Sequence, residues 1–498
     1  MAGLLAIGVM FGIAELVAGL RSNGRSLVVA VGDVIIDTVP GEVERAVIST
    51  LGHWDKPFLI ASILVGAGLL GAALGVLAVR RFVVGAAGLA AMAAIGVAAS
   101  LDDPQASVAD AIVAGVAGAA AGIFALWLLL RAATPRAVPA PAAIRDPAGG
   151  GVADRGRFLG VAAATVLVTA AGVFGGRVLA TGKRIDEIRQ AIRIPRPARR
   201  APAPPAGADL RIPGLAPLYV PNADFYRIDT ALLVPQVDPG DWSLEVKGMV
   251  DKPFTLSYAE LMAIPQIEAD VTLSCVSNEV GGGLVGNARW QGVLLADLLE
   301  RAGVRRDATQ IIGRSVDGFT AGFPTQVALD GRNAMVAVAM NGEPLPAAHG
   351  FPARLVVPGL YGYVSATKWL SAIELTSFDE VDGYWIPRGW AKEGPIKTQS
   401  RIDVASRQVL AGVAWAPTRG IERVEVQSDD EPWLDATLAP PLNDDCWRQW
   451  FVRWELAPGR HMIAVRATDG TGETQTSERT DVAPDGASGY HTVQVDVA

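Results

Sequence analysis

The stretch VTLSCVSNEVGGGLVGNARWQGVLLADLLERAGV, residues 271–304, decides the fold of the soluble part of this chain, because it joins an apolar strand to a glycine-rich turn and a helix. It holds Cys275, one of only two cysteines among 498 residues. Residues up to Cys275 read as a buried strand, and the apolar spacing of 294–304 is helical. The glycines at 281–283 leave room for a bulky ligand beside the backbone, so the thiol stands at the mouth of a turn open to close approach.

The Cys275 thiol could act as a nucleophile or as a metal ligand. A nucleophile needs a neighbouring base, and none of the four histidines in the chain is paired locally with Cys275. Zinc or an iron–sulfur cluster needs several thiolates or imidazoles, which two cysteines cannot supply. A metal that is carried by an organic cofactor and needs one protein sulfur fits this small number of cysteines and histidines best. Cys446, inside the strand-like DDCWRQWF, is predicted to be a small core hydrophobe.

The first 181 residues are predicted to form an α-helical transmembrane bundle. Each of five apolar runs has about the 20 residues that a bilayer core requires. Glycine and alanine at small-xxx-small spacing favour close helix packing rather than a transport pathway. The five runs are residues 3–20, 57–79, 82–101, 108–130 and 158–176.

The sequence also predicts the orientation of this bundle. Residues 26–39 are shorter and carry two aspartates, which favours an interfacial or re-entrant segment over a sixth span. The loop at 131–157 is rich in arginine, whereas 102–107 has no lysine or arginine, which places the loop in the cytoplasm by the positive-inside rule. The multi-pass chain would then lie in the cell membrane with its soluble part outside the cytoplasm.

The soluble part begins after a spacer and divides in two. Residues 182–210 are rich in proline and arginine and predict an extended linker between membrane and catalyst. Residues 211–395 mix strand and helix patterns, which indicates an α+β domain. Residues 396–498 contain alternating strands at short spacing, the signature of an all-β sandwich. The soluble portion is acidic, and the whole chain has a formal net charge of −8. The acidity of the soluble portion argues against nucleic-acid binding.

From about residue 211 to the end, the chain resembles the sulfite oxidase and assimilatory nitrate reductase group of molybdopterin enzymes, in a membrane-anchored bacterial form. The longest matching motif, from Met340 to Leu370, is the most specific. The resemblance implies a molybdopterin-binding α+β domain followed by an immunoglobulin-like domain of the kind used for dimerisation. The motifs are ADFYRIDTALLVP (223–235), WSLEVKGMV (242–250), LSCVSN (273–278), MNGEPLPAAHGFPARLVVPGLYGYVSATKWL (340–370) and GYHTVQVDV (489–497).

The same resemblance assigns roles to individual residues. Cys275 matches the thiolate ligand to molybdenum, and Arg227 stands where an arginine that binds an anion is expected. A guanidinium suits an oxyanion because it offers a fork of donors and stays charged. Tyr384, in DGYWIPRGW, is expected at the pocket mouth as a further catalytic residue. The residues that the resemblance implies for holding the cofactor are Phe225, Tyr226, Arg227, Cys275, Asn278, Asp317, His349, Arg354, Thr367 and Lys368.

The resemblance implies oxygen-atom transfer at molybdenum, with sulfite or another small sulfur or nitrogen oxyanion or oxide as substrate. Here the chain departs from true sulfite oxidases. They carry further arginines after the cysteine, whereas this chain has Glu279 and three glycines. Negative charge near the metal would weaken sulfite binding, so a larger sulfoxide or N-oxide remains open. The two tryptophans of DGYWIPRGW could equally be core residues.

The expected partners follow from the same reasoning. His53 is the one histidine in the first 181 residues, so no haem held by two histidines is expected in this chain. A separate redox carrier, a cytochrome or a quinone, is then required, and a homodimer through the C-terminal domain is one expected assembly. The alternative function is a membrane-anchored binding or structural module whose oxidoreductase domain is inactive and free of cofactor.

Overall fold

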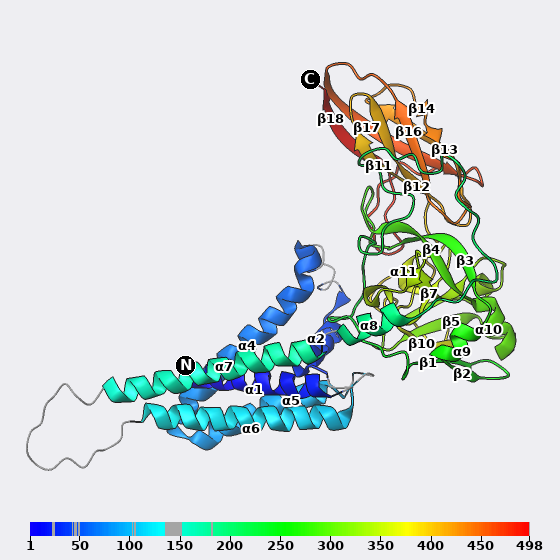
Figure 1. The fold of residues 1–498 in the computed structure, drawn as a ribbon. Coiled ribbons are helices and arrows are strands. Elements are labelled where there is room, and N and C mark those ends of the chain that lie inside the picture. The colour runs from blue at the N-terminus through cyan, green and yellow to red at the C-terminus, as the bar shows by residue number, and fades with distance from the viewer. Residues whose placement is uncertain are drawn as a thin grey trace, which may run out of the picture. The chain divides into compact units, whose positions relative to one another are not determined.

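The structure is a computed structural model that describes residues 1–21, 25–41, 43, 47, 50–101, 103, 106–134, 152–180 and 183–497 (Figure 1). Residues 135–151 of the arginine-rich loop and the side chain of His53 lie outside this description, so the predictions that rest on them are not addressed. The chain forms two compact units. One comprises Met1–Lys183 with Ala231–Leu233, and the other comprises Arg184–Thr230 with Val234–Ala498.

The first unit is helical. Five of its described helices are long and apolar enough to cross a membrane, which agrees with the five predicted spans. The stretch at 26–39 forms a shorter helix, α2, which begins at Leu27 where the Ser26 hydroxyl accepts from the Val29 amide. The helices are α1 (Ala2–Leu20), α2 (Leu27–Thr38), η1 (Gly52–Trp54), α4 (Asp55–Arg80), α5 (Phe82–Ala99), α6 (Val108–Ala133) and α7 (Val152–Ala180).

Glycines bring the backbones of these helices together. A Cβ added at Gly12 of α1 would lie 2.9 Å from the backbone of Thr169 in α7. A Cβ at Gly172 would lie 2.3 Å from the carbonyl oxygen of Gly12, and one at Gly3 would lie 1.9 Å from that of Gly71. Only glycine permits such approaches, because any side chain would have to displace backbone. These contacts agree with the predicted role of the small residues in helix packing.

We expect Gly172→Ala to loosen the packing of α1 against α7. The added methyl group would overlap backbone that cannot move aside, and overpacking of this kind typically costs about 1–3 kcal/mol. Thermal unfolding of the purified full-length chain in detergent measures the effect. Gly160→Ala, on the same helix, is the matched control because its Cβ would meet nothing within 4 Å. Equal melting temperatures for the two variants would contradict the close α1–α7 contact.

The second unit contains two five-stranded sheets that carry the candidate site. One has the order β2-β1-β10-β5-β6, and in the other β3, β4, β7 and β8 follow one another while β9 pairs with β7. Capping by Ser257 and Glu260 starts α9, and Gly303 in a left-handed conformation ends α10. The elements are β1 (Ser243–Gly248), β2 (Phe254–Ser257), α9 (Tyr258–Ala263), β3 (Ile267–Ser274), β4 (Val285–Leu294), α10 (Leu295–Ala302), β5 (Gln310–Ser315), β6 (Thr320–Pro324), η2 (Thr325–Ala328), β7 (Met335–Met340), β8 (Glu343–Pro344), η3 (Ala347–His349), β9 (Arg354–Val356), α11 (Gly362–Ser365) and β10 (Leu370–Thr376).

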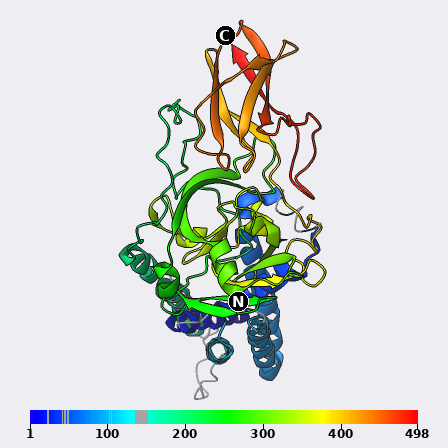
Figure 2. The same ribbon diagram turned by 90° about the vertical axis from the view of Figure 1, so that its right-hand side faces the viewer.

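The C-terminal strands form two four-stranded antiparallel sheets, in orange and red in Figure 2. Their orders are β11-β12-β16-β15 and β14-β13-β17-β18. Trp450 of the first sheet and Val465 of the second belong to one core, so the sheets pack face to face. This is the all-β region that the strand pattern predicts. Its strands are β11 (Gln399–Ala405), β12 (Val409–Trp415), β13 (Ile421–Ser428), β14 (Leu434–Asp435), β15 (Thr437–Leu438), β16 (Arg448–Arg453), β17 (Gly459–Asp469) and β18 (His491–Val497).

The segment predicted as an extended linker is not extended throughout and is not free. Lys183–Ala191 forms a helix, α8, and Ile185 of this helix lies in the core that also contains Phe225 and Trp290. Further on, Arg199 pairs with Ile267 in a parallel bridge. Proline cannot donate to a ladder, yet its carbonyl can accept, as Pro195 does from the side chain of Gln291 at 2.8 Å. The prolines therefore keep the part of the segment after α8 extended without freeing it from the domain.

Candidate functional site

Cys275 lies at the end of β3, where a closed loop connects this strand to β4. The Cys275 amide donates to the Leu284 carbonyl at 2.9 Å, and the Asn278 amide donates to the Cys275 carbonyl at 3.1 Å. The Asn278 side chain accepts from the Leu284 amide at 2.7 Å. Asn278, predicted to contact a cofactor, thus closes the loop from within. The loop holds the thiol in a defined place, with Cys275 only 7% exposed.

The surroundings of the Cys275 thiol disfavour a free thiolate. Burial raises the pKa of the thiol, whereas hydrogen bonds from Ser277 and the positive charge of Lys368 lower it in part. A buried thiol of this kind is inert unless a cation compensates for the lost solvation. The arrangement is unsuited to a free nucleophile and suited to a sulfur that is neutralised by a bound metal.

Phe225 and Tyr226 form an aromatic wall of the site. Their rings stack with centroids 5.2 Å apart, and Phe225 meets Trp290 edge-on at 5.8 Å and His349 at 5.7 Å. Phe225 is 4% exposed, and burial raises the pKa of Tyr226, on which the charge of Cys275 also acts. A Cβ at Gly286 would lie 2.7 Å from the Phe225 ring, so this ring packs directly on β4. These contacts bring together residues from three distant parts of the sequence.

Arg354 and His349 place basic groups behind this wall. Arg354 opens β9, and its guanidinium lies 5.1 Å from the centre of the Trp290 ring and donates to the His349 carbonyl at 3.2 Å. Within the described residues no carboxylate lies within ion-pair distance of it, and burial lowers its pKa to about 10. His349 bonds through Nε2 to the Asn222 carbonyl at 2.9 Å, so Nε2 carries a hydrogen. Burial and the charge of Arg354 lower its pKa to about 4, so His349 is neutral at pH 7.

We expect the buried His349 to make folding sensitive to acid. Its folded-state pKa of about 4 lies below the ordinary value of 6.5. As the pH falls below about 6.5, this histidine takes up a proton in the unfolded chain but not in the folded chain. The free energy of unfolding is therefore highest above about pH 6.5 and decreases by about 3 kcal/mol towards pH 4. Chemical denaturation of the chain at pH 7 and pH 4 should show this loss in the wild type and its absence in His349→Asn. The same pH dependence in both proteins would contradict a buried neutral imidazole.

Asp229 links two further cations, and sequence reasoning missed it. Its carboxylate pairs with Lys368 at 2.6 Å and with Arg227 at 2.9 Å. Asp229 is 4% exposed and Lys368 10%, whereas Arg227 is 41% exposed and reaches the surface. Burial lowers the pKa of Lys368 to about 8 although Asp229 raises it. The signal that could have found Asp229 is an acid two residues after the anion-binding arginine in the motif RIDT.

The remaining predicted residues lie around this group. The fully buried Thr367 donates to the Gly313 carbonyl at 3.4 Å. Asp317 accepts from the Phe319 amide at 3.2 Å, and burial raises its pKa, with Asp229 and Lys368 among the charges that act on it. The centroid of the Tyr384 ring lies 5.7 Å from that of Phe319 and 5.2 Å from that of Trp385. The Arg388 guanidinium lies 3.7 Å from the centre of the Tyr384 ring. Tyr384 thus packs beside Trp385, which lies against the hydrophobic core together with Trp390, so the two tryptophans of this segment have the core role that was left open.

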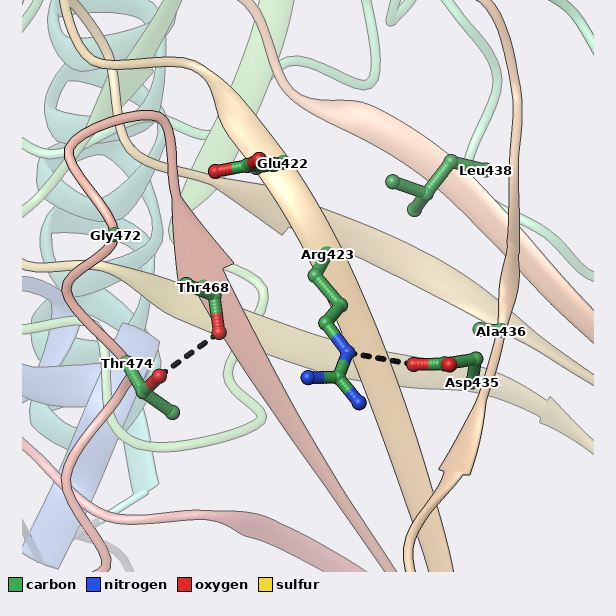
Figure 3. Close-up of a pocket in the computed structure, with 8 residues that line it drawn as sticks. All are labelled: Glu422, Arg423, Asp435, Ala436, Leu438, Thr468, Gly472 and Thr474. Atoms are coloured by element: carbon green, nitrogen blue, oxygen red, sulfur yellow. Dashed lines mark hydrogen bonds and ion pairs between the residues drawn. The ribbon is translucent and has the colours of Figure 1, made fainter.

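One hollow in the C-terminal sheets is separate from these residues. Figure 3 shows Arg423 directed at Asp435, with a distance of 2.6 Å, and Thr468 facing Thr474 at 2.9 Å. Two pairs of its polar side chains bond to each other, and none of its lining residues is among the predicted site residues. The pocket is lined by Glu422, Arg423, Asp435, Ala436, Leu438, Thr468, Gly472 and Thr474.

No group of three or more histidine, cysteine or acidic side chains suitable for a metal ion occurs in the described part of the chain. A metal at Cys275 would thus take one protein sulfur and its other ligands from elsewhere. Lys368 already pairs with Asp229, whereas Arg354 has only backbone carbonyls as hydrogen-bond partners among the described residues. An anion beside Arg354 would therefore be favourable, because burial weakens the solvation of its charge. The site suits a ligand that brings a metal cation and a negatively charged group together.

Comparison with known proteins identifies relatives of this site. Residues 231–385 match the family model described as oxidoreductase molybdopterin binding domain. The uncharacterized oxidoreductase YuiH of Bacillus subtilis is 38% identical over 157 residues, which cover 32% of this chain and 76% of that protein. The mitochondrial sulfite oxidase of Rattus norvegicus is 30% identical over 288 residues, covering 47% of this chain and 52% of its own length. The matched part thus spans about half of that sulfite oxidase.

Two further comparisons extend the set. NADH nitrate reductase 1 of Oryza sativa is 28% identical over 330 residues, covering 52% of this chain and 36% of its own. The crystal structure of the sulfane dehydrogenase SoxCD from Paracoccus pantotrophus matches with a TM-score of 0.50 and 24% identity, over 56% of this chain and 81% of that one. The likeness to SoxCD concerns the fold.

Proposed function

Because the chain belongs to the oxidoreductases with a molybdopterin binding domain, the family of sulfite oxidases and assimilatory nitrate reductases, we propose that it binds the molybdenum–molybdopterin cofactor through the thiolate of Cys275. The buried thiol is the observation that carries this assignment. Its pKa is raised by burial, and the metal's positive charge would remove the cost of ionising it.

The basic residues suit the phosphate of the same cofactor. Arg354 is buried with backbone carbonyls as its hydrogen-bond partners, so a phosphate would supply the counter-charge that it lacks among the described carboxylates. Lys368 would add a second cation, and neutral His349 a further contact. We assign the pterin itself to the residues around these cations, namely Phe225, Tyr226, Asn278, Asp317 and Thr367.

We assign substrate binding to the mouth of the site. Arg227 is half-exposed, and its guanidinium can exchange part of its pairing with Asp229 for an oxyanion. Tyr384, held between Trp385 and Arg388, can hold a hydrogen bond to a substrate oxygen. Sulfite or another small sulfur or nitrogen oxyanion or oxide fits these groups. Glu279 in the glycine loop disfavours a doubly charged anion and favours a neutral oxide by comparison.

When bound, the cofactor supplies two-electron oxygen-atom transfer. The residues of this chain would bind and orient the substrate and exclude water. Arg227 would orient the oxygen-bearing group of the substrate, and the phenol of Tyr384 would donate a hydrogen bond to a substrate oxygen. The wall of Phe225 and Tyr226 excludes water from the thiol, which strengthens every charge interaction in the site.

The other parts of the chain receive their roles from the same proposal. We assign the five apolar helices to a transmembrane bundle that anchors the enzyme in lipid, with the catalytic domain outside the cytoplasm. Residues 211–395 would form the catalytic domain and 396–498 an immunoglobulin-like domain, with dimerisation through it. Electrons would pass to or from a separate cytochrome or quinone.

Metal analysis of the full-length chain, produced in a host that makes the cofactor, tests this function. We expect about one molybdenum per chain, the fluorescence of the oxidised pterin, and turnover of sulfite or a small oxide with an artificial electron carrier. Folded protein that contains neither metal nor pterin would refute the assignment and would favour a membrane-anchored binding module with an inactive domain. Metal without turnover of sulfite would shift the substrate toward the oxides.

A further inference from the structure

The loop that carries Cys275 is held from the C-terminal sheets as well as from its own strands. Arg401 of β11 donates through Nη1 to the Gly282 carbonyl at 2.9 Å. The ring of His491, the first residue of β18, lies against Gly281, where an added Cβ would come within 2.2 Å of it. Strands β11 and β18 are the edge strands of two different sheets. The glycine loop therefore sits where the edges of both C-terminal sheets meet.

Each of these two contacts is itself fixed by further bonds. Asp403 accepts from Arg401 at 2.5 Å and, through its other oxygen, from the Ala216 amide at 3.0 Å. Arg401 and Asp403 are only 13% and 8% exposed, so the pair is a built feature and not a mobile surface contact. The Ile402 amide donates to His491 Nδ1 at 2.9 Å, which fixes the plane of the imidazole. Burial lowers the pKa of His491, in keeping with a neutral ring whose Nδ1 accepts this bond.

Movement of the glycine loop would be transmitted to the thiol. The Gly282 amide donates to the Glu279 carbonyl at 2.8 Å, and the Asn278 amide to the Cys275 carbonyl at 3.1 Å, so successive turns link the held glycines to the cysteine. Gly281 has φ +79°, a conformation that favours glycine. The loop thus combines a backbone that only glycine adopts easily with two contacts from the C-terminal sheets.

We propose that the C-terminal β domain positions the metal-ligand loop, with Arg401 and His491 as positioning residues that set the orientation of Cys275. This inference rests on the proposed role of Cys275 as the molybdenum ligand. Neither residue contacts the thiol, and both act through the glycine loop. The domain then serves the catalytic site of its own chain, whether or not it also forms a dimer. Its removal or displacement would alter the metal site without touching any cofactor-binding residue.

Labelling of Cys275 by a thiol reagent tests the loop directly, in the full-length chain before cofactor loading and with Cys446→Ala so that one thiol remains. Gly281→Ala should label at least about tenfold faster than the parent, because overpacking against the His491 ring populates an open loop. Gly283→Ala is the matched control, since a Cβ there would meet nothing within 4 Å, and should label at the parent rate. In a His491→Ala background, Gly281→Ala should have a smaller effect than in the parent, because the contact with the ring is gone and only the backbone strain of alanine at φ +79° remains.

The loaded enzyme provides the second readout. Arg401→Met should change the electron paramagnetic resonance signal of Mo(V), and Arg401→Lys, which keeps a donor, should restore part of it. Equal labelling of Gly281→Ala and Gly283→Ala, additivity in the His491→Ala background, or an unchanged signal in Arg401→Met would each overturn the proposal. Absence of molybdenum from the wild type would instead refute the proposed function, while the labelling rates would still decide whether the C-terminal sheets hold the loop.

Discussion

Cys275→Ser is expected to abolish cofactor-dependent turnover while the chain still folds. A hydroxyl is a far weaker ligand for the metal than a thiolate, and the substitution changes one buried atom at the mouth of a loop whose hydrogen bonds are made by the backbone and by Asn278. Loss of a group that merely supports a metal ligand costs 10- to 100-fold, so loss of the ligand itself should exceed about 100-fold. Turnover per chain, measured beside molybdenum content, gives the result.

Cys446→Ala is the control for this experiment. Cys446 is the other buried thiol of the chain, 2% exposed, and burial together with Asp270 and Asp445 raises its pKa. It lies in the loop before β16 and is not among the residues assigned to the cofactor. We expect Cys446→Ala to lower stability modestly and to leave molybdenum content and turnover per metal unchanged. Equal turnover in Cys275→Ser and Cys446→Ala would remove Cys275 from the mechanism.

Asp229→Asn is expected to lower the stability of the second unit strongly. The carboxylate lies between Lys368 and Arg227, and both it and Lys368 are largely buried. Removing one partner of a buried pair leaves a charge without compensation, which costs about 3–5 kcal/mol. Chemical denaturation before cofactor loading measures the loss. After loading, the cofactor's phosphate should compensate Lys368 in part, so the difference from the wild type should shrink.

A surface pair shows whether the effect comes from burial. Asp435 pairs with Arg423 at 2.6 Å, but the side chains are 67% and 53% exposed. Asp435→Asn therefore changes the same chemical group in a solvated setting, and we expect the free energy of unfolding to stay almost constant. A cost for Asp229→Asn no larger than that for Asp435→Asn would mean that Asp229 is not the buried counter-charge described above.

The candidate site came partly from residue types and partly from a resemblance. Cys275 after an apolar strand favoured a metal carried by an organic cofactor, whereas the cations between Met340 and Leu370 were implied by the resemblance to a known family. Asp229 was missed although it follows Arg227 by two residues, because no local pattern relates it to its other partner, Lys368, 139 residues away. Trp290 was missed for the same reason, since the sequence does not indicate that this side chain of a strand contacts Phe225 and Arg354.

By itself, the sequence determined the features that depend on neighbouring residues. Five apolar runs of bilayer length appear as five long helices, and strand alternation placed the all-β region at the C-terminal end, because hydrophobic length and periodicity are local properties. Only the tertiary structure decided which groups are buried and which charges meet. In the tertiary structure, the proline-rich segment packs along the domain and Gly281 lies against the His491 ring. The sequence could not show these contacts, because they arise from packing between segments that no local pattern relates.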